Sequence, residues 1–126
     1  MNSAYAAAGF TFNLVGTSFT VNDAWAAAGQ SSSAELAMKT ALHQGTYDTL
    51  NLYFLSDLGG GLLGFCYFPE ANPTAQDKIL DGCVNLAGSM PGVNELPNYD
   101  LGLTTVHETG HVSLALLSKD LQTCSY

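Results

Sequence analysis

The feature that most constrains the fold of this chain is a long run near its C-terminus, LGLTTVHETGHVSLALLSKD (residues 101–120). Its apolar positions recur at helical spacing, and they are Leu103, Val106, Gly110, Leu114 and Leu117. The run predicts a helix with one apolar stripe that packs against the rest of the domain. Asp100 stands where an N-cap residue belongs, and nothing before Lys119 interrupts the helical pattern.

Within this predicted helix, His107, Glu108 and His111 form the pattern HExxH. Each helical residue advances by about 100°, so the two histidines project from one side, at a spacing that a single metal ion can bridge. Imidazoles are suitable zinc ligands, and Glu108 points further round the helix, where a general base would stand. The pattern predicts a zinc site for amide hydrolysis, and the alternative is a helix with two surface histidines and a solvated glutamate.

The rest of the chain carries shorter patterns that together predict an α+β domain. Strand-like patterns cover residues 10–22, 49–57, 59–69 and 81–89, helical patterns cover residues 2–8 and 33–44, and loop-like composition covers residues 70–82 and 90–100. Glycines flank the third strand-like run, and they permit either a close approach of another backbone or, as the simpler interpretation, a flexible turn.

The second of these helices is predicted to begin at a Ser33 cap and to stop before Gly45. Its apolar residues fall on one predicted face, which consists of Leu36, Ala37, Ala41 and Leu42. His43 lies near the end of the helix, where a histidine is expected to be solvated beside the last carbonyl groups rather than to bind a metal.

Composition limits the classes of partner. A chain of 126 residues with 47% hydrophobic and 11% charged residues is expected to fold as one domain. Its net charge of −8 would repel a phosphate backbone, which argues against a nucleic acid partner. No apolar run approaches the roughly 20 residues that span a bilayer, so we predict a soluble protein. The N-terminus is unlike a signal peptide, so the protein is either cytosolic or lacks its true N-terminus.

Three cysteines, Cys66, Cys83 and Cys124, allow at most one internal disulfide. Cys66 and Cys83 both lie in strand-like contexts, which favours them as the pair. The alternative is two buried free thiols, because free cysteine packs readily in protein cores.

Several blocks of the sequence resemble a known family. They are NSAYAAAGFTFNLVGT, WAAAG, ELAMKTALHQGTYDTLNLYF, GGGLLGFCYFP, DGCVNLAGSMPG and YDLGLTTVHETGH. Together, and in this order, they are similar to the fungal secreted metalloproteases of the pappalysin family, which are metzincin zinc endopeptidases. The resemblance covers nearly all of residues 2–111.

This resemblance implies specific roles and a specific fold. It makes His107 and His111 ligands of Zn²⁺ and Glu108 the general base, and it pairs Cys66 with Cys83. The implied fold is the upper half of a zincin, with a small twisted mixed sheet backed by one helix and the motif helix below it. The implied protein is a secreted monomer that acts on protein or peptide substrates, aligned by an edge strand near residues 61–68.

The chain departs from the family after His111. The family motif continues as HExxHxxGxxH, but Leu114 occupies the position of its glycine and Leu117 that of its third histidine. Leucine and alanine favour a continued helix, which would carry residue 117 roughly 9 Å along the axis beyond His111. Asp120 or Cys124 would be alternative ligands only if that helix ended early.

These departures predict that the chain is a partial catalytic domain. Residues 1–126 would form the upper subdomain, without the lower subdomain and its methionine-containing turn, since no methionine follows Met90. Two ligands are fewer than catalytic zinc sites use, so we expect weak zinc binding and poor proteolysis. The alternatives are a secreted pseudoprotease that keeps this subdomain for binding and an unrelated acidic module with a chance motif.

Overall fold

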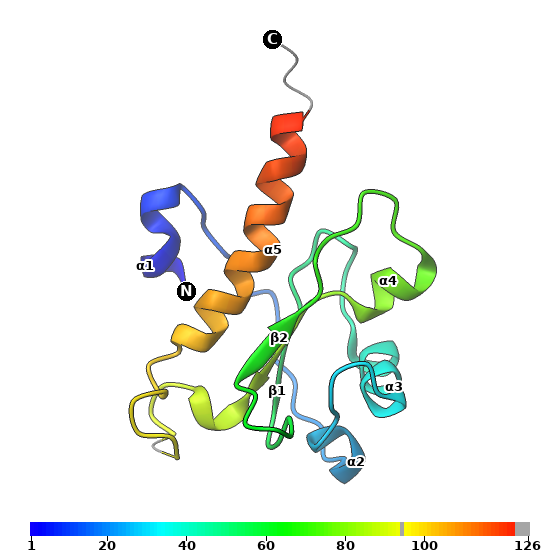
Figure 1. The fold of residues 1–126 in the computed structure, drawn as a ribbon, viewed down its shortest axis with the longest axis vertical. Helices are drawn as coiled ribbons and strands as arrows, with labels where there is room; N and C mark the ends of the chain where they lie inside the picture. The colour runs from blue at the N-terminus through cyan, green and yellow to red at the C-terminus, as the bar shows by residue number, and fades with distance from the viewer. Residues whose placement is uncertain (94, 123–126) are drawn as a thin grey trace.

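A small mixed β-sheet is the centre of the fold, and helices lie on both of its faces (Figure 1). The computed structural model describes residues 1–93 and 95–122, and the side chains of residues 1–93 and 95–112. In chain order the elements are α1 (Asn2–Tyr5), η1 (Ala6–Ala8), α2 (Asp23–Ala26), α3 (Ser33–Leu42), β1 (Leu52–Leu55), β2 (Gly64–Cys66), α4 (Ala75–Leu80), β3 (Cys83–Leu86), η2 (Ala87–Ser89) and α5 (Leu103–Gln122). The predicted α+β class and mixed sheet are confirmed.

The strands lie in the order β1-β3-β2, so β3 is central and β2 is an edge strand within the described chain. β1 runs parallel to β3, and β2 runs antiparallel to it. The predictions of strands within residues 49–57, 59–69 and 81–89 are therefore confirmed, although each strand is shorter than its sequence pattern.

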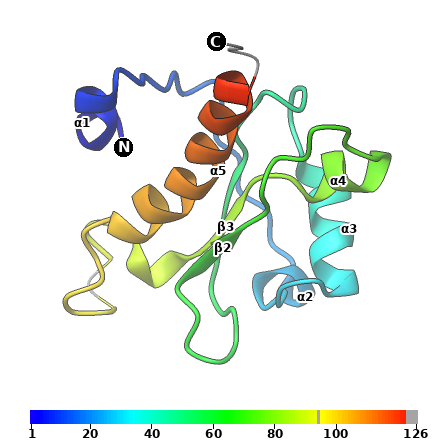
Figure 2. The same cartoon turned by 45° about the horizontal axis from the view of Figure 1, so that its top comes forward.

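The two faces of the sheet differ in character. Tyr53, Phe65 and Val84 share one face, where they join a buried core with Met38 of α3. Residues on the opposite face include Gly64, whose backbone lies against side chains of α5. Figure 2 shows α5 crossing this face while α3 lies on the other side of the sheet. α3 therefore packs on the face of the sheet opposite to α5.

The buried face of α3 agrees only in part with the predicted one. Leu42 packs against the core and Leu36 is half-buried, but Ala37 and Ala41 are exposed. Glu35, Met38 and Lys39 are buried instead, because Glu35 and Lys39 form an ion pair of 3.1 Å with both side chains 0% exposed. Their i, i+4 spacing is one at which side chains of a helix meet.

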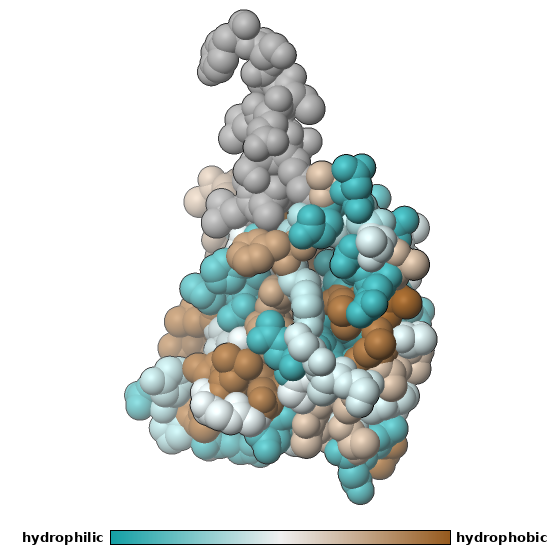
Figure 3. Space-filling view, turned by 45° about the vertical axis from the view of Figure 1, so that its right-hand side comes forward, coloured by the Kyte–Doolittle hydropathy of each residue, from teal (hydrophilic) through white to brown (hydrophobic). Residues whose placement is uncertain are grey.

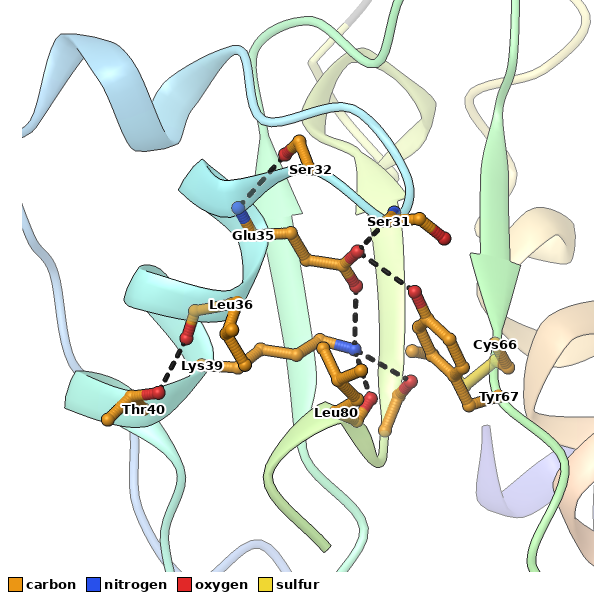
Figure 4. A network of polar contacts seen from close by, with 11 residues as sticks. Ser31, Ser32, Glu35, Leu36, Lys39, Thr40, Cys66, Tyr67 and Leu80 are labelled. Carbon is orange, nitrogen blue, oxygen red and sulfur yellow. Dashed lines mark hydrogen bonds and ion pairs between the residues drawn. A yellow bond between two sulfur atoms is a disulfide. The ribbon is translucent and has the colours of Figure 1, made fainter. Parts of the chain in front are cut away.

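Lys39 lies in a closed polar network between α3 and the corner that precedes β3 (Figure 4). Its Nζ donates to the carbonyl oxygens of Leu80 at 2.6 Å and Gly82 at 3.4 Å, and it lies 4.6 Å from the ring centre of Tyr67. Glu35 also accepts hydrogen bonds from the Ser31 N–H and the Tyr67 hydroxyl. Burial lowers the pKa of Lys39, although the adjacent Glu35 carboxylate acts in the opposite direction.

The prediction of a strand over residues 10–22 was wrong, because no strand of the described chain pairs with this segment. Leu14, Val15, Phe19 and Val21 are each at least 87% exposed. Alternation of apolar and polar residues stabilises a strand only when a neighbouring strand and a covered face are available.

Residues 70–82 are not all loop, as α4 shows. Thr74 forms a capping box with Asp77, in which each side chain accepts a hydrogen bond from the backbone of the other residue. This cap starts the helix, and the spacing of Thr74 and Asp77 is visible in the sequence. Asn72, Pro73 and Gly82 flank this short helix, and residues of these types favour a loop.

Two helix starts also differ from the predictions. Ser32, not Ser33, caps α3 by accepting from the backbone of Glu35. Asp100 does not cap α5, because the helix begins at Leu103. The predicted helix over residues 2–8 is confirmed as α1 and η1, which end at Gly9 with a φ of 77°.

His43, at the end of α3, is half-buried and lies near Asp81. The expectation of a solvated histidine is therefore only partly met. None of the helices in the described part of the chain is long and apolar enough to cross a membrane.

Candidate metal centre

The motif residues lie on a helix that continues without a break beyond them. α5 runs from Leu103 to Gln122, so the predicted continuation through residues 114 and 117 is confirmed for the backbone. Thr109 and Val112 are buried, while Leu103 is 62% exposed. The predicted apolar stripe is therefore wrong at its first position, because the helix turns Thr109 rather than Leu103 toward the rest of the fold.

His107 and His111 bring their imidazoles together on the exposed side of α5. Their Nε2 atoms are 3.1 Å apart, and their rings meet edge to face with centres 4.7 Å apart. Two zinc–nitrogen bonds of about 2.05 Å at a tetrahedral angle would separate the nitrogens by roughly 3.3 Å. The spacing of the pair thus fits two ligands of one zinc ion.

β2 and the residues after it run beside the motif. The Phe68 ring packs edge to face against the His111 ring, with centres 5.7 Å apart. At the other end of the strand, Gly64 lies against Glu108. Residues 64–68, which comprise β2 and the two residues after it, therefore flank the motif from Glu108 to His111.

Gly64 allows α5 to lie close to the sheet. A Cβ at this position would lie 3.0 Å from Glu108 Cγ, 3.1 Å from the Val84 carbonyl oxygen and 3.2 Å from Thr104 Cγ2. Such distances are shorter than ordinary van der Waals contacts, so a larger residue would displace the helix or the glutamate side chain. The absence of a side chain at Gly64 therefore determines where the half-buried Glu108 lies.

A disulfide joins β2 to β3 under the motif helix. Cys66 and Cys83 are direct partners in the sheet, with Cα atoms 4.2 Å apart, and they form this bond. They are two residues away from Gly64 and Asn85 along their strands, so they share the face that α5 covers. The disulfide ties the edge strand beside the motif to the central strand.

The N-terminal segment supports α5 from another side. The Tyr5 hydroxyl donates a 2.6 Å hydrogen bond to the Val106 carbonyl, and a Cβ at Gly110 would lie 3.3 Å from that hydroxyl. The Tyr5 ring also packs edge to face on Phe10 and Phe12. Gly110 within the motif thus lets the N-terminal residues approach the helix backbone.

No third ligand joins the two histidines within the described part of the chain, where no group of three or more His, Cys, Asp or Glu residues is placed to hold a metal. Asp120 lies inside α5, so the early helix end that would bring it back to the histidines does not occur. Cys124 lies outside the described residues. The described residues thus bring together two imidazole nitrogens, with Glu108 adjacent to His107 in the sequence.

A shallow depression of about 220 Å³ lies next to Phe68. Its lining residues are Tyr67, Phe68, Glu70, Asp77, Leu80 and Asp81. Burial raises the pKa of Asp81, while the pKa of Asp77 is lowered by its hydrogen bonds with Thr74. Figure 3 displays a face of mixed polarity, on which small apolar patches alternate with hydrophilic residues.

Sequence patterns located the motif but not the residues that surround it. The glycine-flanked run was predicted to lie near an edge strand, and β2 is such a strand. The particular contacts of Gly64 with Glu108 and of Phe68 with His111 had no local signal, because they depend on how two distant segments pack.

Comparisons with known proteins point to one class of enzyme. Proteins named "Extracellular metalloprotease" are 52% identical over 107 residues in Arthroderma otae, 51% over 111 residues in Pyricularia oryzae and 54% over 112 residues in Uncinocarpus reesii. These alignments cover 85%, 88% and 88% of this chain, respectively. No family model and no solved structure matches the chain.

The chain spans only 37% to 39% of the length of these relatives. Their names agree with the metalloprotease class that the sequence predicts.

Proposed function

We propose that this chain carries part of a zinc endopeptidase centre of the pappalysin type, in which His107 and His111 bind Zn²⁺ and Glu108 is the general base. The observation that carries the proposal is the 3.1 Å spacing of the two Nε2 atoms on the exposed side of α5. The names of the fungal relatives support the same class of reaction.

Zinc, when bound, would activate a water molecule and polarise the carbonyl group of a peptide bond. His107 and His111 would hold that ion through their Nε2 atoms, which lie 3.1 Å apart. Glu108, one residue after the first histidine, takes a proton from the attacking water and returns it to the leaving amine. The Glu108 side chain is half-buried and packs against Gly64, which restricts its movement.

The substrate of this centre is an extended protein or peptide segment. β2 is an edge strand beside the motif, and an edge strand offers unpaired backbone groups to a peptide that adds to the sheet. The disulfide between Cys66 and Cys83 limits movement of this edge relative to β3.

The chain alone is a weak zinc binder and a poor protease. Catalytic zinc sites use three protein ligands and one open position, whereas the described residues supply two ligands. The continuous helix prevents the turn that would bring a later residue back to the metal. In this proposal residues 1–126 are the upper subdomain of a larger catalytic domain, which is secreted and monomeric.

Zinc titration of single-histidine variants tests the proposal. His107→Ala and His111→Ala are each expected to abolish the zinc uptake of the chain, measured by calorimetry. His43→Ala is the matched control, because it removes a histidine on α3 away from the motif. Unchanged uptake in both motif variants would refute the site and leave an acidic module with a chance motif. A longer protein that includes the lower subdomain provides a second test. If it takes up zinc but does not cleave protein substrates, the pseudoprotease alternative is favoured.

A further inference from the structure

Asn85 on the central strand is an unexplained buried polar residue. Its side chain is 0% exposed, and neither its Nδ2 nor its Oδ1 has a hydrogen-bond partner among the residues that the structure describes. A buried amide without partners destabilises a fold, so native structures rarely keep one. The mechanism described above does not use this residue.

The register of the sheet shows which face Asn85 occupies. Asn85 is the direct partner of Gly64 across β2 and β3, and directly paired residues present their side chains on the same face. The Gly64 side of that face lies against Glu108 and Thr104. The Asn85 amide is therefore buried under α5, on the side where the motif carboxylate lies.

The distance between the Asn85 amide and Glu108 depends on how Gly64 and Asn85 pair in the sheet. Leu86 donates its N–H to the Leu63 carbonyl, so the next pair, Gly64 and Asn85, is a non-hydrogen-bonded pair with close side chains. The Asn85 Cβ then lies about 5 Å from the position of a Cβ on Gly64. That position is 3.0 Å from Glu108 Cγ. These distances bring the Asn85 amide and the Glu108 carboxylate within reach of each other.

We infer that Asn85 is a positioning residue for Glu108. No direct hydrogen bond joins the two side chains, so the Asn85 Nδ2 donates to one buried water that in turn donates to the Glu108 carboxylate. This water-mediated contact satisfies the Asn85 Nδ2 and holds the Glu108 side chain over Gly64. The role in positioning a general base rests on the proposed function, whereas the contact itself does not.

A double-mutant cycle in the metal-free chain tests the water-mediated contact. Asn85→Leu keeps the approximate volume and removes the amide, and Glu108→Ala removes the carboxylate. Asn85→Leu is expected to lower the folding equilibrium constant in the parent and to raise it in the Glu108→Ala background. The resulting coupling is about tenfold or more, as measured by urea unfolding. Equal effects of Asn85→Leu in both backgrounds would overturn the inference.

An NMR measurement covers the case in which Asn85→Leu fails to fold. Glu108→Gln is expected to shift the side-chain amide resonances of Asn85. Glu70→Gln, which removes an exposed carboxylate of equal charge, is expected to leave them unchanged. Absence of a shift with Glu108→Gln, or an equal shift with Glu70→Gln, would overturn the inference. Neither experiment needs zinc or activity, so failure of zinc binding would refute the proposed function and leave this contact intact.

Discussion

Replacing Lys39 with methionine should destabilise the fold more than its distance from the motif suggests. Lys39→Met keeps the aliphatic stem but leaves the Glu35 carboxylate buried without its cation, and both side chains are 0% exposed. It also removes the donors to the Leu80 and Gly82 carbonyl groups. Breaking a buried ion pair from one side costs about 3–5 kcal/mol. Since a chain of 126 residues has a total stability of roughly 6–19 kcal/mol, this loss is a large share.

Urea unfolding followed by the fluorescence of Trp25, the single tryptophan, measures the loss. Lys78→Met is the matched control, because Lys78 is exposed and carries the same charge.

A second variant separates the lost pair from lost packing. Lys39→Met combined with Glu35→Leu is expected to recover most of the stability, because an apolar pair of similar volume often replaces a buried ion pair without loss. A single Lys39→Met variant within about 1 kcal/mol of the parent at neutral pH would refute the reasoning, since surface ion pairs are worth no more than that.

Three further predictions concern the sheet. Gly64→Ala is expected to lower the free energy of unfolding by about 1–3 kcal/mol in urea, because its Cβ would overlap Glu108; an unchanged midpoint would contradict this contact. Tyr53→Phe is expected to stabilise the chain by about 1 kcal/mol near neutral pH, because the Tyr53 hydroxyl is buried without a partner among the described residues. Burial raises the pKa of the Tyr53 hydroxyl in the folded chain. The parent is therefore expected to lose stability as pH rises above about 10, where tyrosine ionises in the unfolded chain. Tyr53→Phe is expected to lack this loss. Replacing both Cys66 and Cys83 with alanine is expected to lower the free energy of unfolding by about 3 kcal/mol, because the disulfide joins residues 17 positions apart. Thermal unfolding of this variant is compared with that of the oxidised parent and of the reduced parent.

Local sequence patterns were sufficient where a segment's structure depends on its own residues. The alternation at residues 49–57 and the unbroken leucine-rich run after His111 predicted β1 and the length of α5. The spacing of Thr74 and Asp77 is also a local signal, because it indicates the capping box that starts α4. The segment 10–22 shows the limit of such patterns, because its alternation has no sheet partner in the described chain.

The surroundings of the candidate site required the tertiary structure. Helical geometry alone brought His107 and His111 together. The contact of Gly64 with Glu108, and the position of Asn85 beneath the same helix, arise from the pairing of strands about 20 residues apart and from the packing of α5 on them. No periodicity within one segment carries that information.

Zinc retention after dialysis tests the central claim most directly. The claim is that two histidines on an unbroken helix hold zinc too weakly for catalysis. The chain, loaded with zinc and dialysed, is expected to keep much less than one equivalent and to cleave casein or gelatin poorly or not at all. One full equivalent that survives dialysis, together with proteolysis that Glu108→Gln abolishes, would contradict the account and require a further ligand.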